Sequence, residues 1–412
     1  MTFPIDAVRS RFPALSVTDH GRTRVHLDAP GGTQACSGAI EGMQRHLVEG
    51  TANAGGAFAT SVETDALVHS AHQAVADLLN AEPDEVAFGP NMTSLTFAVS
   101  RALSRDWQAG DELVVTRLDH DANVAPWLAV VEDRGMIIRW LDFDPESGRL
   151  RLKLLPGLLS ERTRLVAIGG ASNVLGTIAD LGEAVRTVRQ HSAALVFVDA
   201  VQLAPHVALD VRALACDLLA FSPYKLFGPH AGVLWGRRDL ADQLQSYKVR
   251  PAPTRGMLRF ETGTPSFEAQ AGILGMVEYL DWLGDTVSPG LSTRRDRLVA
   301  AFAACERYED ELGNRLLLGL ARFSSIRLYG PANISARVPT FAFTVEGFAP
   351  GEVVKHLSDR AIYAWAGHFY AVETIARLGL EQSGGLVRVG LCHYNTSEDV
   401  DRLLAALAEL VA

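Results

Sequence analysis

Residues 221–236 read FSPYKLFGPHAGVLWG, and a single lysine, Lys225, lies between two runs of apolar and small residues. The two runs are typical of strands that fold back on each other. Burying an unpaired ammonium costs several kcal/mol. Lys225 must therefore either extend its ammonium group to solvent or have a chemical partner.

The overall composition is that of a large globular protein. The chain has 412 residues, of which 48% are hydrophobic, a formal net charge of -10 and a pI near 5.7. Lys and Arg are scattered, so no basic stripe could follow the phosphates of a nucleic acid. No apolar run is long and uncharged enough to span a bilayer, and the N-terminal residues lack the apolar core of a signal peptide. We therefore expect a cytoplasmic protein that binds neither nucleic acid nor membrane.

The cysteines predict neither a metal site nor a disulfide framework. Cys36, Cys216, Cys305 and Cys392 are far apart in the sequence and form no CxxC pair, so we expect reduced and mostly buried thiols. The sequence also lacks HExxH, Walker A and GxGxxG motifs, which removes the usual support for zinc hydrolysis, a phosphate-binding loop or dinucleotide binding.

The order of apolar runs predicts an α/β protein. From about Asp65 to Gly236, helical periodicity alternates with short apolar runs, as in βαβ units with a mostly parallel sheet. The predicted strands are ELVVTRLD (112–119), MIIRWLDF (136–143), RLVAIGG (164–170), ALVFVDA (194–200) and DLLAFS (217–222). The predicted helices between them include PWLAVVEDRG (126–135) and EAVRTVRQH (183–191).

The pattern changes beyond Pro289 and predicts a smaller α+β domain. A long helix places Leu298, Phe302, Cys305, Tyr308 and Leu312 on one face. The short strands RVPTFAFTV (337–345) and LVRVGL (386–391) and a final helix starting at Thr396 follow it. We predict an N-terminal segment (1–30) that packs on the small domain, a large domain (31–285) and a small C-terminal domain (286–412).

Polar side chains follow the predicted strands at the points where ligands bind in an open parallel sheet. His120 follows strand 112–119, and Asn173 follows strand 164–170. Asp199 ends the next strand with Gln202 beyond it, and Ser222 ends the last strand three residues before Lys225. EVAFGP (85–90) leads through Asn91 and Met92 to Thr93 at an expected helix start.

Together these residue types match the needs of pyridoxal 5'-phosphate. A lysine forms the Schiff base, a carboxylate pairs with the pyridinium nitrogen, and a helix N-terminus with hydroxyl groups binds the phosphate. His120 could stack on the ring and move protons, and Asn173 could bind the 3-hydroxyl group. Any one such residue is more often structural, so the prediction depends on their combination at one sheet edge. Lys225 then has a partner, the cofactor aldehyde.

Seven motifs, in order along nearly the whole chain, resemble those of class V aminotransferase-fold enzymes, specifically the cysteine desulfurase-like group. They are HLDAPGG (26–32), DHDANVAPW (119–127), ASNVLGT (171–177), VDAVQ (198–202), SPYKLFGP (222–229), RFETGTPS (259–266) and VRVGLCHYNT (387–396). The resemblance implies the fold type I architecture of pyridoxal phosphate transferases, with a large cofactor domain and a small C-terminal domain.

The resemblance also implies a role for each matching residue. Lys225 would form the Schiff base, Asp199 would pair with the pyridinium nitrogen, and His120 would stack on the ring. Around the cofactor it implies Thr93, Asn173, Gln202, Ser222, Tyr224 and the backbone of Asn91 and Met92. Thr264 would reach the phosphate of the neighbouring subunit in a homodimer, and Arg388 would bind the substrate carboxylate as a planar two-pronged donor.

Two departures from the family pattern bear on the reaction. Desulfurases carry RxGHHC where this chain has WAGHFY (365–370), so an aromatic residue replaces the persulfide-forming cysteine. Cys392 lies four residues after Arg388 and could still approach the site in space. The second departure is Tyr224, which precedes Lys225 where a histidine is usual and could still donate its hydroxyl to the phosphate.

The same segment suggests a substrate preference. We expect Trp365, His368 and Tyr370 beside the substrate, where Trp365 and Tyr370 with Phe369 would form an aromatic wall. Such a wall would favour an amino acid with a bulky or apolar substituent over free cysteine. The alternative is that these aromatic residues pack in the core or at an interface.

Three functions compete on these observations. The first is an enzyme that binds an α-amino acid as an external aldimine, removes the α-proton with Lys225 and eliminates a group at Cβ, most simply by C–S cleavage. The second is an aminotransferase or epimerase on the same scaffold. The third is a non-catalytic scaffold, against which the presence of Lys225, Asp199 and Arg388 argues.

Overall fold

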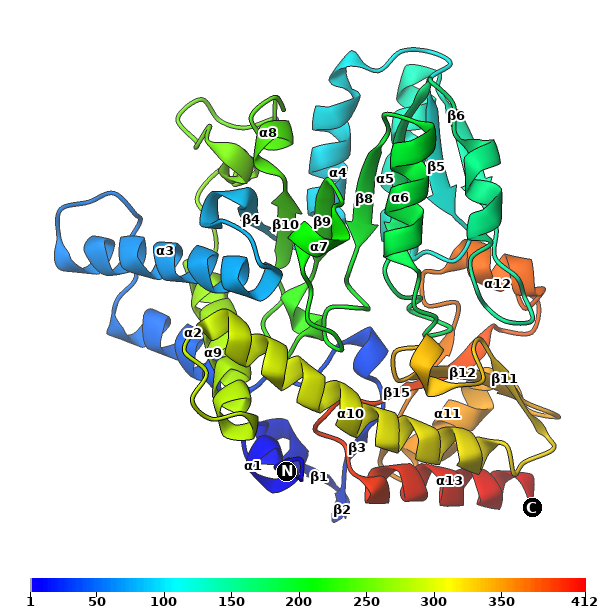
Figure 1. Ribbon diagram of the computed structural model, residues 1–412. Helices are drawn as coiled ribbons and strands as arrows, with labels where there is room; N and C mark the ends of the chain where they lie inside the picture. The colour runs from blue at the N-terminus through cyan, green and yellow to red at the C-terminus, as the bar shows by residue number, and fades with distance from the viewer. Residues whose placement is uncertain (1) are drawn as a thin grey trace.

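A seven-stranded sheet forms the centre of the larger part of the molecule (Figure 1). The computed structural model describes residues 2–412. The strands are β4 (Val86–Gly89), β5 (Glu112–Thr116), β6 (Ile137–Leu141), β7 (Thr163–Gly169), β8 (Leu195–Asp199), β9 (Leu218–Phe221) and β10 (Gly232–Gly236). Their order in the sheet is β4-β10-β9-β8-β7-β5-β6, and β10 runs antiparallel to both of its neighbours, whereas the other pairs among these seven strands are parallel. The predicted α/β class with a mostly parallel sheet is confirmed.

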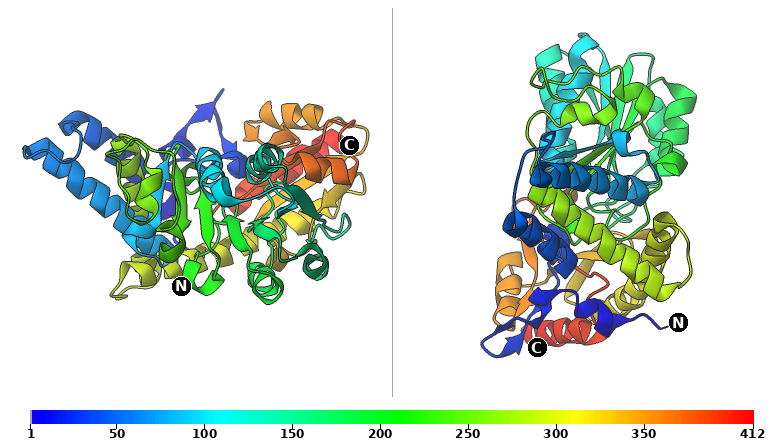
Figure 2. Two further views of the ribbon diagram at one scale, coloured as in Figure 1. Left: turned by 90° about the horizontal axis from the view of Figure 1, so that it is seen from above. Right: turned by 90° about the vertical axis from the view of Figure 1, so that its left-hand side faces the viewer.

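Helices cover both faces of this sheet (Figure 2). Alternate residues of each strand enter different cores, so that Val196 and Val198 pack on one side and Phe197 on the other. The first side is covered by α6 (Leu181–His191), and the second by α4 (Met92–Leu103) and α5 (Ala125–Arg134). Burial on both faces explains why these strands read as nearly continuous apolar runs in the sequence.

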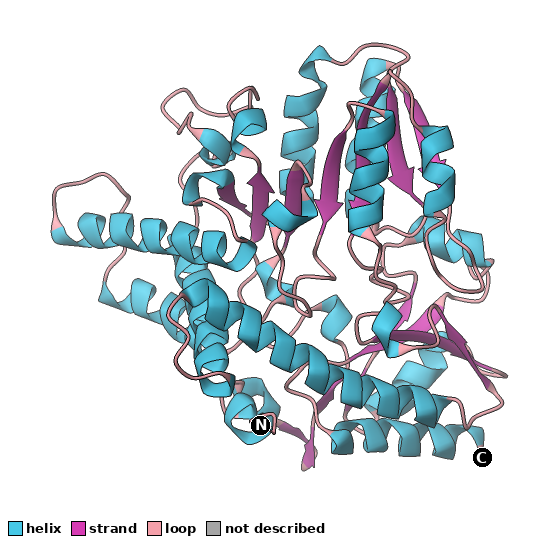
Figure 3. Ribbon diagram, viewed as in Figure 1, coloured by secondary structure: helices cyan, strands magenta, loops and turns pink. Residues whose placement is uncertain are grey.

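A second sheet, antiparallel and four-stranded, lies in the C-terminal part (Figure 3). Its strands are β11 (Ile326–Tyr329), β12 (Thr340–Val345), β14 (Trp365–Gly367) and β15 (Leu386–Gly390), in the order β11-β12-β15-β14. The helices α10 (Arg294–Leu320), α11 (Pro350–Ser358) and α13 (Ser397–Val411) bury apolar side chains in the core that this sheet shares. The N-terminal strand β3 (Val25–His26) pairs with β13 (Ile362–Tyr363), which ties the start of the chain to this part.

The remaining elements surround the two sheets. The helices are α1 (Ile5–Arg9), α2 (Ser37–Glu49), α3 (Ala59–Leu79), α7 (Val211–Leu214), α8 (Arg238–Ala241), α9 (Phe267–Val287) and α12 (Val372–Leu378), and the strands are β1 (Thr18–Asp19) and β2 (Arg22–Thr23). Within residues 2–412, none of the helices combines the length and the apolar character that a membrane span requires.

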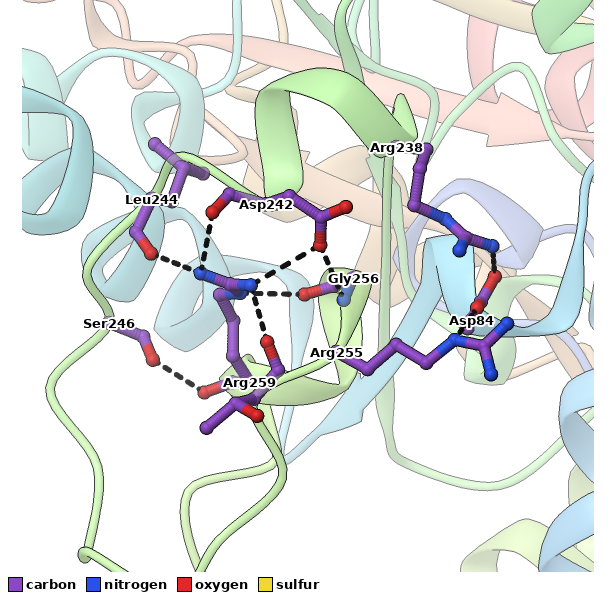
Figure 4. A network of polar contacts seen from close by, with 9 residues as sticks. Asp84, Arg238, Asp242, Leu244, Ser246, Arg255, Gly256 and Arg259 are labelled. Atoms are coloured by element: carbon purple, nitrogen blue, oxygen red, sulfur yellow. Dashed lines mark hydrogen bonds and ion pairs between the residues drawn. The ribbon is translucent and has the colours of Figure 1, made fainter.

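The segment between α8 and α9 is held by arginines (Figure 4). The Arg259 guanidinium donates to the carbonyl oxygens of Gly256, at 2.8 Å, and of Leu244. Asp84 forms ion pairs with Arg238 and Arg255. Arg259 begins the motif RFETGTPS, so these bonds fix the segment that leads to Thr264.

Candidate active site

Two adjoining cavities, of about 50 and 540 Å³, lie where the central strands end. Both are lined by Thr93, His120, Ala122, Asn173, Tyr224 and Lys225. Of the other predicted site residues, Met92, Asp199, Gln202 and Ser222 line the smaller cavity, and Trp365, Tyr370 and Arg388 line the larger one. The fold therefore brings together residues that are up to 296 positions apart, from Met92 to Arg388.

Three predicted residues do not line these two cavities. Asn91 caps α4, where its Oδ1 accepts the Ser94 N–H at 2.8 Å. His368 is exposed and lines neither cavity, because its Nδ1 turns back to accept the Tyr370 N–H at 3.1 Å. Thr264 is exposed and lines a third cavity of about 530 Å³ with His230, whose ring stacks on Tyr224 at 4.7 Å. The predicted contact of Thr264 with the phosphate of a neighbouring subunit stays a prediction.

Lys225 is buried, with 6% of the residue exposed, so it does not extend to solvent. It ends a short 3-10 helix, Pro223–Lys225, that follows β9. Burial, together with the positive charge of Arg388, lowers the pKa of Lys225 to about 7 against the opposing effect of Asp199. Much of the amine is therefore neutral at neutral pH and able to act as a nucleophile or base.

Two buried carboxyl groups lie at the floor of the smaller cavity. Burial raises the pKa of Asp199 to about 6, although the Val201 N–H (2.9 Å) and the charge of Lys225 favour its ionised form. Burial and the charge of Asp199 raise the pKa of Asp119 to about 8. At pH 7 Asp199 is thus mostly ionised and Asp119 mostly protonated, which leaves one negative charge for a cationic ring nitrogen.

The imidazole of His120 is neutral and oriented. Burial, with the charges of Lys225 and Arg388, lowers its pKa to about 3. Its Nδ1 accepts the Ala122 N–H at 3.0 Å, which places the ring proton on Nε2. The ring stacks on Tyr370 with the centroids 5.6 Å apart. A flat neutral ring fixed in this way suits stacking on an aromatic cofactor.

Arg388 lies in the larger cavity on β15 with 4% of the residue exposed. Its NH1 donates to the Asn173 carbonyl oxygen at 2.8 Å, and its guanidinium carbon lies 4.2 Å from the Phe369 ring centroid. Burial lowers its pKa to about 9, so it remains a cation at neutral pH. A buried guanidinium with no acidic ion-pair partner among residues 2–412 is a suitable site for a substrate carboxylate.

The turn at 368–371 carries backbone strain. Phe369 and Tyr370 have φ values of 53° and 56°, in the left-handed region that bulky residues rarely adopt. Asn173 Nδ2 donates to the Phe369 carbonyl oxygen at 2.8 Å, and the Asp121 N–H donates to that of Tyr370 at 2.7 Å. Strain held by such bonds is characteristic of functional sites, and here it fixes two aromatic rings beside Arg388 and His120.

The N-terminus of α4 provides donors for an anion. The Met92 N–H donates to Ser222 Oγ at 3.0 Å, and the Ser94 N–H donates to Asn91. These bonds leave the N–H of Thr93, whose residue lines both cavities, for a ligand. A helix N-terminus with a free N–H and neighbouring hydroxyl groups suits a phosphate.

Gly232 sets the position of this helix end. A Cβ atom at Gly232 would lie 2.4 Å from the Asn91 backbone carbon. We expect Gly232→Ala to displace Asn91, to lower the free energy of unfolding by about 1–3 kcal/mol and to weaken binding of the phosphate-bearing cofactor. Gly351→Ala, in α11 with open space around its Cβ, is the control. Denaturation and cofactor titration of both variants test this, and a Gly232→Ala protein equal to the control would contradict it.

The lowered pKa of Lys225 predicts a pH dependence. Because only the neutral amine attacks an aldehyde, the rate at which the apo protein takes up pyridoxal phosphate should rise roughly 10-fold from pH 6 to pH 8 and then level off. An unperturbed lysine would continue to gain rate up to about pH 10. Stopped-flow absorbance, with Nα-acetyl-lysine as the reference amine, measures both profiles. If the two pH profiles were parallel, burial would not lower the pKa of Lys225.

Several cavity residues were not assigned a role from the sequence. Asp119 is the last residue of a predicted strand, and Phe97 lies one helical turn after Thr93, so strand-end position and i,i+4 spacing could have indicated them. Gly31 has no such signal. It approaches Trp365 so closely that a Cβ atom at Gly31 would lie 2.5 Å from the indole Nε1.

The polar atoms of the cavities fit pyridoxal phosphate. Buried Asn173 Oδ1, Gln202 Oε1 and Arg388 Nε have no hydrogen-bond partner in the structure. Asn173 Oδ1 can accept from the 3-hydroxyl group, Asp199 can pair with the ring nitrogen, and Thr93 can donate to the phosphate.

Within residues 2–412, His, Cys, Asp and Glu do not gather in the groups of three that would hold a metal ion.

Comparison with known proteins identifies the family of the chain. The family model described as Aminotransferase class-V matches residues 25–403. The chain is 33% identical to the Aminotransferase-like protein FGM3 of Gibberella zeae, covering 98% of both chains. It is 31% identical to a cysteine desulfurase of Dickeya dadantii, covering 98% of this chain and 96% of the relative.

Solved structures show the same fold. The apo cysteine desulfurase of Thermococcus onnurineus NA1 superposes with a TM-score of 0.88 at 25% identity, covering 100% of this chain and 98% of the other. The Escherichia coli cysteine desulfurase CsdA gives 0.84 at 26% identity, covering 100% and 99%. The chain therefore belongs to the class-V aminotransferase family, is related to the cysteine desulfurases, and has pyridoxal phosphate as its cofactor.

Proposed function

We propose that this protein is a lyase that cleaves the Cβ–S bond of an S-substituted L-cysteine. The observation that carries the proposal is that the cysteines are buried away from the two cavities. All four are buried, and Cys392, which is closest in sequence to Arg388, lines neither cavity. Burial raises the pKa of each thiol. No cysteine is thus placed to receive sulfur from a substrate, so sulfur would leave as a thiol.

The chain's own residues supply positioning and proton transfer. Arg388 binds the substrate carboxylate, and the neutral amine of Lys225 accepts the α-proton. Asp199 would keep a negative charge beside the nitrogen of the cofactor ring, and His120 would stack on that ring. When bound, pyridoxal phosphate supplies the electron sink that makes the α-proton acidic. The balanced reaction consumes one S-substituted cysteine and one water and releases a thiol, pyruvate and ammonia.

The shape of the larger cavity supports a large substituent on sulfur. Its volume is about 540 Å³, and Pro30, Phe97, Trp365, Phe369 and Tyr370 line it. Trp365 and Tyr370 are 52% and 67% exposed, so neither is packed in the core of this chain. Apolar surface of this kind favours apolar groups by about 25 cal/mol per Å² buried.

Product analysis tests the proposal. We expect the holoenzyme to convert S-benzyl-L-cysteine to benzyl mercaptan, pyruvate and ammonia in equal amounts, with a higher kcat/KM than for free L-cysteine and no persulfide on the protein. A keto acid that retains the benzylthio group would show transamination instead, and an inverted α-carbon would show epimerisation. Turnover of free cysteine equal to or faster than that of S-benzyl-L-cysteine would contradict the substrate preference.

A further inference from the structure

The larger cavity contains one acidic side chain, Asp121, among charged groups that are otherwise basic. Lys225 and Arg388 lie at its buried end, with 6% and 4% of each residue exposed. Asp121 is half-buried and lines the same cavity as the exposed residues Trp365 and Tyr370. The cavity therefore combines two buried basic residues with an acidic residue that is partly exposed.

Asp121 is held in place but not neutralised. Its N–H donates to the Tyr370 carbonyl oxygen at 2.7 Å, which links it to the strained turn that orients Tyr370. Across residues 2–412 its carboxylate takes part in no ion pair, whereas other acidic residues such as Glu373 and Asp142 pair with arginines nearby. The adjacent His120 is neutral and directs its Nδ1 to Ala122. The carboxylate is thus available to a ligand.

Like the Asp121 carboxylate, the aromatic side chains that line the cavity with it are suited to binding a cationic group. Trp365 lies opposite Arg388 in the pairing of β14 with β15, so both side chains project from the same face of the sheet. Trp365 and Tyr370 are among the more exposed large side chains of the chain. Aromatic faces attract cations, and a carboxylate beside them adds a direct ion pair.

We propose that the substrate is an α-amino acid whose side chain ends in a cationic group carried on an apolar chain or ring. Its α-carboxylate binds Arg388, and its distal cation lies between Asp121 and the rings of Trp365 and Tyr370. These three residues then determine specificity. The inference rests on the proposed function for the position of the substrate's reacting end, its α-carbon and Cβ–S bond. It adds the chemical class of the group at the other end of the substrate side chain.

Three S-substituted cysteines of similar size test the inference on the holoenzyme. They are S-(2-aminoethyl)-L-cysteine, which is cationic, S-propyl-L-cysteine, which is neutral, and S-carboxymethyl-L-cysteine, which is anionic. Binding is measured from the change in cofactor absorbance, and turnover from pyruvate release. We expect the cationic compound to bind about 5- to 30-fold more tightly than the neutral one, and the anionic one most weakly.

Variants assign the preference to the named residues. Asp121→Asn should bring the cationic-to-neutral ratio close to one, and Trp365→Leu should reduce it. Asp133→Asn, an exposed acid on α5 outside the cavity, makes the same change in net charge and should keep the wild-type ratio. Raising the salt concentration should narrow the wild-type preference, because the ion pair is partly exposed.

The outcomes separate the inference from the proposed function. If the cationic compound binds most tightly but no compound releases pyruvate, the inference holds and the elimination reaction is wrong. If all three release pyruvate with similar binding and similar kcat/KM, the elimination stands and the inference is wrong. An unchanged ratio in Asp121→Asn would also overturn the inference.

Discussion

Lys225→Ala should abolish both the cofactor's lysine-linked absorbance and the reaction. Among residues 2–412, Lys225 is the only lysine that lines the pocket with Asp199, His120 and Asn173, so the pocket would lose both the covalent attachment and the base for the α-proton. Loss of a positioned proton-transfer group alone lowers a rate by about 10²–10⁴-fold. We expect kcat to fall by at least this factor, as measured by single-turnover kinetics with S-benzyl-L-cysteine.

A matched lysine variant controls for charge. Lys355, on α11, has a side chain that is 72% exposed and pairs with Asp359, so Lys355→Ala should keep the cofactor spectrum and the rate. Lys225→Arg retains a cation but lacks a neutral amine near pH 7, and it should be as inactive as Lys225→Ala. If Lys225→Arg kept the cofactor spectrum and the activity, the role of this lysine would be electrostatic only, contrary to our account.

Arg388→Lys should raise KM far more than it lowers kcat. The buried guanidinium donates to the Asn173 carbonyl oxygen and stacks on Phe369, and its unpartnered Nε remains available to a carboxylate. A lysine cannot reproduce this planar two-pronged geometry. Removing one partner of a buried charge pair costs about 2–5 kcal/mol, which corresponds to a KM increase of roughly 30-fold to 1,000-fold or more.

The control for this change is on the same sheet. Arg327, on β11, is exposed and rests on the ring of Tyr329, so Arg327→Lys should leave KM unaltered. The Arg388→Lys holoenzyme should also keep its cofactor absorbance, because Arg388 binds substrate and not cofactor. A fall in kcat at constant KM would show that Arg388 positions the reacting groups and does not bind the carboxylate.

The part of the site that lies on the parallel sheet could be predicted from the sequence. Apolar runs mark the strands, and in a parallel sheet the residues that follow the strands must meet at one edge. Asn173, Asp199, Ser222 and Lys225 all meet this condition and line the cavities. Only local hydrophobic patterns and one topological rule were needed.

The part contributed by residues 365–370 could not be predicted in the same way. The left-handed backbone of Phe369 and Tyr370 depends on bonds from Asn173 and Asp121, which lie about 200 or more residues away in the chain. The same turn directs the ring of His368 away from the cavity. Propensity favours other conformations for these residues, so their positions follow from tertiary contacts and not from local sequence.

Asn91 shows a similar limit at the start of α4. The prediction places the backbone of Asn91 near the phosphate, and the sequence does not show whether its side chain caps the helix or faces the ligand. In the structure the Asn91 side chain caps the helix, and the Met92 N–H donates to Ser222 Oγ. Thr93 is therefore the residue of this helix end that is left to bind a ligand in the cavities.

Borohydride reduction of the holoenzyme followed by peptide mass spectrometry tests most directly whether Lys225 carries the cofactor. Reduction makes the link between lysine and pyridoxal phosphate permanent, and the other lysines of the chain are Lys153, Lys248 and Lys355. Our account predicts one reduced cofactor per chain, on the peptide that contains Lys225. A cofactor on any other lysine, or none on Lys225 after reconstitution, would contradict it.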